Sequence, residues 1–240
     1  MTIKHSLRKI LWNFGYDVVP FGPDRHYLAR RRHLIRQAAI DVVLDVGANT
    51  GQFATELRED IGFRGDIVSF EPLTSAFRVL EQRSGSDPKW RAVQCALGDE
   101  DGTAEIQVAG NSYSSSLLKM LPAHIEAAPE SAYQGREQIM TRRLDTILES
   151  CCDINSNIYL KIDVQGFERR VIKGAEASLP RIKAIQLEMS LTPLYEGESP
   201  FGEMHELLQS RGFNLYSLEP GFANRKTGQL LQVDGIYVRA

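Results

Sequence analysis

Short apolar runs alternate with amphipathic stretches through the middle of this chain. Near-continuous hydrophobic runs are typical of strands that are buried on both faces of a parallel sheet, and they occur at residues 42–46, 67–70, 90–96, 158–162 and 184–189. Helical patterns fill the intervals, at residues 53–57, 74–83 and 167–175. The alternation predicts an α/β fold in which helices cover both faces of a doubly wound, mostly parallel sheet.

Two segments depart from this alternation. Residues 103–108 alternate with period two, a serine-rich stretch follows, and residues 138–142 again have the pattern of a strand. We therefore expect a β-containing insertion at about residues 102–143. Near the end, a helical pattern after Ser199 is followed by strands at 214–218 and 231–239 with no helix between them, which predicts an antiparallel pair.

Composition places the chain among ordinary globular proteins. It has 240 residues, of which 42% are hydrophobic and 25% charged. These values exclude a collagen-like or disordered chain, and no uninterrupted apolar run is long enough to predict a transmembrane segment. We expect a single domain over residues 1–240, made of an N-terminal helical arm (1–40) and a core (41–240).

Charge is unevenly distributed along the chain. Residues 1–36 contain eight Lys and Arg against two Asp, a balance of +6. Because the net charge of the chain is −3, the remaining residues carry −9. A basic arm suits peripheral contact with a membrane surface or a phosphate-bearing substrate, whereas solvated charge on a surface helix is the simpler explanation. No nucleic-acid partner is expected from this pattern.

The cysteines indicate a reducing compartment. Cys95, Cys151 and Cys152 have no CxxC spacing, so the sequence predicts neither a disulfide framework nor a zinc site. We therefore expect a cytoplasmic protein.

The strongest chemical signal is VVLDVGANTGQFA, residues 42–54, which joins a buried strand to a helix through a turn that contains Gly47, Asn49 and Gly51. Glycines let the backbone approach a ligand closely. Asp45, at the strand tip, would repel a pyrophosphate at the following helix N-terminus. It favours a nucleoside ligand with no phosphate and a cationic amino-acid end, such as S-adenosylmethionine.

A second acid supports a nucleoside site. Glu71 ends the next strand, 26 residues after Asp45, where a carboxylate can accept both hydroxyls of an adenosine ribose. Alternatively, Asp45 and Glu71 only cap the helices that follow them.

Taken together, several motifs resemble those of the FkbM-type methyltransferases, a family of S-adenosylmethionine-dependent O-methyltransferases. The resemblance spans about residues 42–197 and rests on DVGANTGQFA, SFEP, QCALGDEDGT, RLDTIL, LKIDVQGFERRVIKGA and QLEMSLTPLYEG. It implies a class I methyltransferase (Rossmann-like) sheet of seven strands in the order 3-2-1-4-5-7-6, with the last strand antiparallel. It also implies that the cofactor is surrounded by Asp45, Gly47, Asn49, Gly51, Glu71, Ala96 and Leu97.

The resemblance implies an acceptor as well: a hydroxyl of a sugar or glycosylated metabolite, either a small molecule or a glycolipid. Two other functions stay open at this point. A dinucleotide-dependent oxidoreductase or epimerase is disfavoured by Asp45 and by the absence of G-x-G-x-x-G. A non-catalytic cofactor-binding module is compatible with the motifs if the acceptor site is degenerate.

Two further acids lie at the ends of neighbouring predicted strands. Asp163 follows the strand in LKIDVQG, and Glu188 lies in QLEMS. Neighbouring carboxylates there can hold a divalent cation such as Mg²⁺, or one of them can act as general base. Alternatively, Asp163 orients the methionine end of the cofactor and Glu188 pairs with a surface base. Gln165 stands where many family members have Glu, which makes it a poor base or metal ligand.

The insertion supplies the remaining candidates. His124 has the near-neutral pKa expected of a general base, although a lone histidine is more often a packing or surface residue. Asn111, Ser115 and Ser116 belong to a row of hydroxyl-bearing residues that could bind a sugar, although flexible loops are also rich in serine.

Overall fold

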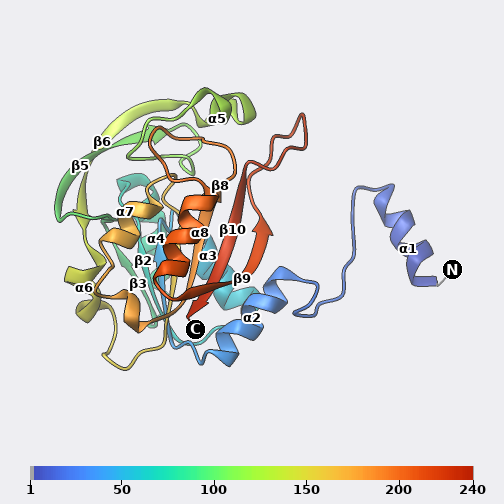
Figure 1. Cartoon of the computed structure of the whole chain (residues 1–240), viewed down its shortest axis with the longest axis horizontal. Helices are drawn as coiled ribbons and strands as arrows, with labels where there is room; N and C mark the ends of the chain where they lie inside the picture. Colours follow the sequence, from blue (N-terminus) through green and yellow to red (C-terminus); the bar gives the residue numbers. More distant parts are fainter. Residues whose placement is uncertain (1–2, 240) are drawn as a thin grey trace.

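A seven-stranded sheet organises the chain. The computed structural model describes residues 3–239, with side chains from Arg8 onward. The strands are β1 (Val42–Val46), β2 (Asp66–Phe70), β3 (Trp90–Val93), β7 (Ile158–Ile162), β8 (Ile182–Ser190), β9 (Phe213–Pro220) and β10 (Gln232–Arg239). Their order is β3-β2-β1-β7-β8-β10-β9, and β10 is antiparallel to both neighbours (Figure 1). The class I methyltransferase topology expected from the sequence is confirmed.

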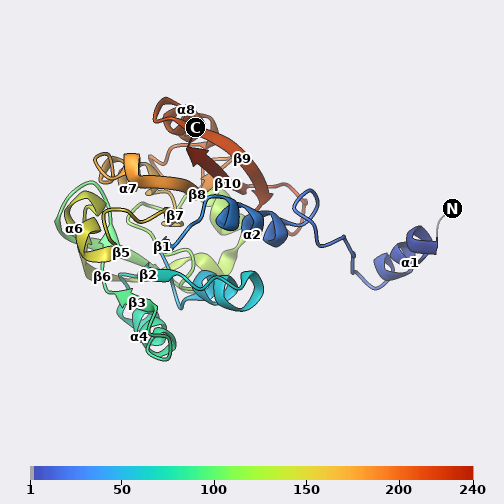
Figure 2. The same ribbon diagram turned by 90° about the horizontal axis from the view of Figure 1, so that it is seen from below.

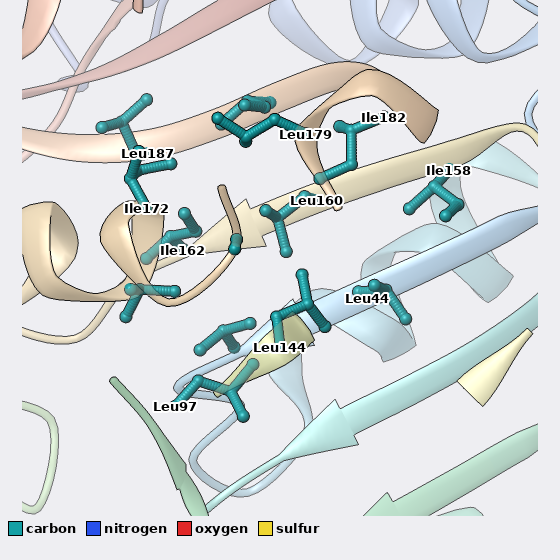
Figure 3. Close-up of a cluster of buried hydrophobic side chains, with 14 of the residues drawn as sticks. Leu44, Leu97, Leu144, Ile158, Leu160, Ile162, Ile172, Leu179, Ile182 and Leu187 are labelled. Carbon is teal, nitrogen blue, oxygen red and sulfur yellow. The ribbon is translucent and has the colours of Figure 1, made fainter. Parts of the chain in front are cut away.

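Helices cover both faces of this sheet. One face packs on α6 (Leu144–Cys151), α7 (Glu168–Lys173) and α8 (Phe201–Ser210), and Figure 3 shows part of the apolar cluster between them. The other face packs on α2 (Tyr27–Gln37), α3 (Gln52–Glu56) with the wide turn η1 (Leu57–Ile61), and α4 (Thr74–Ser84). Burial on both sides explains why β1 and β7 are so apolar in sequence.

Strand register places polar side chains side by side within this apolar setting. Asp45 of β1 lies opposite Ser69 of β2 and Lys161 of β7. Because side chains alternate between faces, all three belong to the face that carries α2 and α3.

The insertion forms a second, three-stranded sheet. It has the order β4-β6-β5, with β4 (Ala96–Leu97), β5 (Gly102–Ala109) and β6 (Tyr133–Arg142). The predicted strand at residues 90–96 is thereby corrected: β3 ends at Val93, and Ala96 pairs instead with Thr141 of β6. The helices α5 (Pro122–Ala127) and η2 (Pro129–Ser131) complete the insertion, which lies at the top of the view in Figure 1.

The two helices of the N-terminal arm differ in how they pack against the rest of the protein. Helix α1 (Ile3–Trp12) lies away from the body in both Figure 1 and Figure 2, whereas α2 buries Leu34 and Ile35 against the sheet. The expectation of solvated charge is wrong for Arg31, which is buried between Glu56 and Glu219. Lys4 lies outside the described side chains.

The remaining short helix is η3 (Leu179–Arg181), which leads into β8. Within residues 3–239, no helix combines the length and the apolar character needed to cross a membrane.

Candidate active site at the carboxyl edge of the sheet

A first cavity of about 240 Å³ opens where β1, β2, β7 and β8 end, beneath the insertion. Its apolar wall consists of Val46, Pro72, Leu73, Ala96, Leu97, Ile106, Leu117, Val164 and Phe167. Its polar wall consists of Asn49, Glu71, Ser112, Tyr113, Ser115, Asp163, Gln165 and Glu188, and Gly47 adds backbone. Candidates from six separate stretches of sequence therefore meet here.

A second cavity of about 560 Å³ adjoins the first and shares Gly47, Asn49, Tyr113 and Asp163 with it. It extends toward α2 and the ends of β9 and β10, and its other lining residues are Tyr27, Arg31, Ala48, Gln52, Phe53, Glu56, Lys161, Gln186, Glu219, Pro220 and Asp234. The two cavities meet at the turn after β1 and at Asp163.

The turn after β1 is held in shape by its backbone. Gly47 has a φ of +76°, and a Cβ there would overlap the carbonyl oxygen of Asp163. Only glycine lets the β1 and β7 loops approach so closely. Gly51 lines neither cavity, because it packs on Trp90, whose ring would lie 2.8 Å from an added Cβ. Of the two predicted cofactor glycines, Gly47 alone borders the site.

Glu71 lies at the end of β2 with both carboxylate oxygens already oriented. The backbone N–H of Asn49 donates to Oε2 at 2.8 Å, and that of Leu73 donates to Oε1 at 2.9 Å. Burial nevertheless raises the pKa of Glu71 to about 7. Each oxygen keeps a lone pair for a ligand hydroxyl, and Ala96 and Leu97 line the same cavity, as predicted.

Asp45 differs from its predicted role. It is fully buried and lines neither cavity. Lys161 Nζ lies 3.4 Å from Asp45 Oδ1 and 3.4 Å from Asp163 Oδ2, and it donates to the carbonyl of Gly47 at 3.4 Å. Burial raises the pKa of Asp45 while the Lys161 ammonium lowers it. The sequence predicted that Asp45 presents an unpaired negative charge to the cofactor, and the structure corrects this, because Asp45 is paired with Lys161. Lys161, and not Asp45, lines the second cavity.

Gln165 joins the two acids that the sequence placed at neighbouring strand ends. Its Nε2 donates to Asp163 Oδ1 and to Glu188 Oε2, both at 2.9 Å. Its Oε1 accepts a hydrogen bond from the hydroxyl of Tyr195 at 2.6 Å, which defines the orientation of the amide. Gln232 donates to the same Glu188 oxygen at 2.7 Å. Asp163 and Glu188 are thus brought together as predicted, through an amide rather than an ion.

Burial makes this cluster retain protons. The pKa of Glu188 is raised well above its ordinary value, first by burial and then by the charges of Asp163, Asp234 and Glu168. Glu168 accepts the N–H groups of Val164 and Gly166, and burial raises its pKa to about 7. Burial therefore favours the protonated form of Glu188. Asp163 is the acid that lines both cavities.

Comparison with known proteins identifies this arrangement. The family model described as "Methyltransferase FkbM domain" matches residues 45–215, which include the turn after β1, Glu71, Asp163 and Glu188. The chain belongs to the FkbM methyltransferase family. It is accordingly an S-adenosylmethionine-dependent methyltransferase, which removes the oxidoreductase alternative.

Two curated relatives and one solved structure are similar to this FkbM-family chain. The 2-O-methyltransferase NoeI of Sinorhizobium fredii is 26% identical over 177 residues, which cover 70% of this chain and 71% of that protein. The 31-O-demethyl-FK506 methyltransferase FkbM of Streptomyces tacrolimicus is 28% identical, over 86% and 85% of the two chains. A crystal structure of an FkbM methyltransferase from Methylobacillus flagellatus KT covers 82% of this chain with a TM-score of 0.49 and 13% identity. This chain spans 43% of that longer protein.

The site of this chain does not fit Mg²⁺. A cation bridging Asp163 and Glu188 would need the space between them, where the amide nitrogen of Gln165 lies within hydrogen-bonding distance of both. Mg²⁺ requires oxygen ligands, and this nitrogen presents hydrogens. Within the described part of the chain, no three His, Cys, Asp or Glu side chains come together as a metal site. The predicted metal role of Asp163 and Glu188 therefore has no structural support.

The insertion candidates separate when they are placed in the structure. Ser115 lines the first cavity, and its Oγ accepts the N–H of Ala109 at 3.0 Å. Ser116 lines neither cavity, because its hydroxyl donates to the carbonyl of Gln165 at 2.6 Å. Asn111 bonds Ser114 within its own turn and also lies off both cavities. Ser115 alone of these predicted substrate residues reaches the site.

His124 is packed away from the chemistry. Its ring lies 5.2 Å from that of Tyr195 and 5.3 Å from that of Phe222, measured between centroids, and it lines neither cavity. Burial lowers its pKa to about 4. The structure thus gives His124 the packing role that was the alternative to a general base.

Several site residues were not identified from the sequence. Tyr27 and Arg31 come from α2, and Lys161 from the centre of β7. A lysine inside the otherwise apolar run IYLKI was an available signal, because a buried strand lysine requires acidic partners. Arg31 carried no comparable signal, since it lies among other arginines in ARRRHL.

Proposed function

We propose that this FkbM-family enzyme transfers the methyl group of S-adenosylmethionine to a hydroxyl of a sugar or glycosylated metabolite, free or lipid-linked. The observation that carries the proposal is the position of Asp163, which lines both cavities and so stands between a cofactor site and an acceptor site. The names of two relatives, a 2-O-methyltransferase and a 31-O-demethyl-FK506 methyltransferase, support oxygen as the acceptor atom.

The first cavity suits the adenosine part of the cofactor. Glu71 offers two oriented acceptor oxygens for ribose hydroxyls, and Leu73, Ala96 and Leu97 offer an apolar wall for a flat base. When bound, S-adenosylmethionine supplies a methyl group that its sulfonium already activates. The protein is left with alignment of the two reactants and removal of one proton.

The second cavity suits a neutral, polyhydroxylated acceptor. Arg31 is paired with Glu56 and Glu219, and Lys161 with Asp163, so the cations of this cavity are already compensated. Four acids against two cations line the cavity, which disfavours the phosphate-bearing acceptor considered for the basic arm. The charged and amide side chains of this cavity include both hydrogen-bond donors and acceptors, as hydroxyl groups require. Tyr27, Phe53 and Tyr113 add aromatic surface.

Asp163 is the general base in this proposal. The amide of Gln165 donates to its Oδ1, and Lys161 lies beside its Oδ2, so two donors orient the carboxylate at the junction of the cavities. Its side chain is 36% exposed, which gives an abstracted proton a route to solvent. Glu188 does not line the second cavity, and burial favours its protonated form, so Asp163 is the acid placed to take the acceptor proton.

Turnover on a defined acceptor panel tests the proposal. The purified protein is incubated with labelled S-adenosylmethionine and neutral glycosides, the products are examined by mass spectrometry and NMR, and binding of S-adenosylhomocysteine is measured by calorimetry. We expect a methyl ether on a sugar hydroxyl. Methylation of nitrogen or carbon, or a preference for phosphorylated acceptors, would refute the acceptor assignment. Cofactor binding without turnover on any acceptor would favour the non-catalytic module.

The cytoplasm is the compartment that we propose for this reaction. Cys95, Cys151 and Cys152 are free thiols, and burial raises the pKa of each. Fractionation of the producing cells with antibody detection tests this location, and recovery of the protein outside the cells would contradict it.

A further inference from the structure

The end of α1 and the segment that joins it to α2 expose an unusual amount of apolar surface. Six of its side chains are at least 48% exposed: Ile10, Trp12, Phe14, Tyr16, Val18 and Phe21. They make up six of the 16 large hydrophobic residues that are exposed in the described chain, within only twelve positions. Scattered exposed hydrophobic residues are normal, but a concentration of this kind marks an interaction surface.

Residues 8–21, called here the N-terminal segment, have local order of their own, and Phe21 packs on His26 at the start of α2, with 4.9 Å between the ring centroids. The Arg8 guanidinium donates to both oxygens of Asp17, at 2.5 and 2.6 Å, and the indole N–H of Trp12 donates to Asp17 at 3.0 Å. These bonds fold the end of α1 onto the stretch that follows it. Both views show α1 standing clear of the sheet and its helices (Figures 1 and 2).

Charge distinguishes between possible partners of this segment. Residues 1–36 carry +6 and the rest of the chain −9, and the acid of the segment, Asp17, is already paired with Arg8. Residues 8–21 themselves carry a net charge of +1 (Arg8, Lys9 and Asp17), and the adjoining residues 25–36 contribute five arginines. A second copy would bring two of these net-positive N-terminal stretches together. An anionic lipid surface attracts the segment and repels the acidic body, so it also orients the molecule.

The residue types fit the same partner. Trp and Tyr favour the boundary between lipid headgroups and acyl chains, where an apolar ring and a polar group are both satisfied. Phe14 and Phe21 supply apolar area on either side of Tyr16, and Lys9 is exposed beside Ile10. Short basic, aromatic segments of this kind bind in the plane of a bilayer surface.

We propose that residues 8–21 dock this protein on the surface of an anionic lipid bilayer. The segment continues within a few residues into Tyr27 and Arg31, which line the second cavity. Docking would therefore hold the acceptor cavity close to the bilayer. The binding itself is independent of the proposed methyl transfer.

Vesicle binding of the full chain tests the proposal. Co-sedimentation is measured with vesicles of phosphatidylcholine alone and of phosphatidylcholine mixed with phosphatidylglycerol. We expect binding to the mixed vesicles that weakens as NaCl is added. Trp12 is exposed and Trp90 is buried, so a blue shift of tryptophan emission on binding reports the environment of Trp12.

A triple variant, Phe14→Ser with Val18→Ser and Phe21→Ser, removes apolar surface and retains the Trp12 reporter. We expect its partition onto mixed vesicles to fall at least about tenfold, because membrane affinity scales with buried apolar area. The matched control, Val79→Ser with Ile154→Ser and Leu191→Ser, removes exposed apolar residues elsewhere and should bind as the wild type does. Thermal unfolding and S-adenosylhomocysteine binding confirm that both variants are folded.

Three outcomes would overturn the proposal. The wild type could stay in the supernatant with mixed vesicles at low salt. The triple variant could bind as well as the wild type. Finally, analytical ultracentrifugation could detect self-association that the triple variant abolishes while no vesicle binding occurs, which would assign the segment to a second copy.

Discussion

The ammonium nitrogen of Lys161 lies 3.4 Å from Oδ1 of Asp45, in the middle of the sheet and beneath the junction of the two cavities. Asp45 has no exposed surface, and Lys161 is buried as well. Asp45 depends on Lys161 in particular, because removal of the ammonium leaves a fully buried carboxyl group without its cation, whereas Lys161 also lies beside Asp163. Lys161 also donates to the carbonyl of Gly47 and lies beside Asp163, so this ion pair helps to hold both the turn after β1 and the candidate base in position.

Lys161→Met should destabilise the fold by about 3–5 kcal/mol, the cost typical of one unpaired charge in a buried pair. Urea denaturation of the wild type, Lys161→Met, Asp45→Asn and the double variant forms a cycle. We expect the double variant to be more stable than Lys161→Met alone, since the orphaned carboxylate is gone. Strictly additive losses would show that the two charges do not interact.

Asp163→Asn should lower kcat by about 10²–10⁴-fold, the range of general base catalysis. The dissociation constant for S-adenosylhomocysteine should stay close to the wild-type value, because the asparagine keeps the shape at the cavity junction. The control is His124→Phe, which alters a packed ring off both cavities and should retain kcat. Normal turnover by Asp163→Asn, or its loss in a folded His124→Phe, would reverse the assignment of the base.

Gln165→Glu should create a site for divalent cations. The new carboxylate would lie within hydrogen-bonding distance of Asp163 and Glu188, giving a group of three carboxylates where the wild type has two. Calorimetric titration with MgCl₂ should give heat with this variant and none with the wild type or with Gln165→Met. Wild-type turnover should be unchanged in excess chelator, and a loss there would contradict the amide-bridged site.

Glu71 should make the fold less stable as the pH rises. Its pKa is about 7 in the folded protein against 4.5 for an ordinary glutamate, so the folded state holds the proton more tightly. The stabilisation is fully present below about pH 4.5 and is lost as the pH rises through 7, by at most about 3 kcal/mol. Urea denaturation between pH 5 and pH 8 should show a smaller decline for Glu71→Gln than for the wild type. Parallel curves would mean that Glu71 does not titrate in this interval.

Much of the architecture follows from the sequence. The apolar runs at β1 and β7 were predicted with the bounds that the structure has, because strands buried on both faces need continuous hydrophobic residues. The positions of Glu71, Asp163 and Glu188 at the cavity followed from strand ends that meet at one edge of a parallel sheet. At residues 90–96 the apolar pattern continues beyond Val93, the last residue that pairs with β2. The sequence could not show that Ala96 pairs in the second sheet instead.

The partners of the buried polar groups required the tertiary structure. Asp45 meets Lys161 through the register of β1 with β7, and Gln165 reaches Asp163, Glu188 and Tyr195 through a loop conformation and a particular amide orientation. Likewise, His124 is buried because the insertion folds onto Tyr195 and Phe222. The type of a residue determines which hydrogen bonds and ion pairs its side chain is able to make. Which partners the side chain meets, and whether water reaches it, depends on contacts between segments distant in sequence. Those contacts determine charge and reactivity here, because burial and pairing shift the pKa of an ionisable group away from its ordinary value.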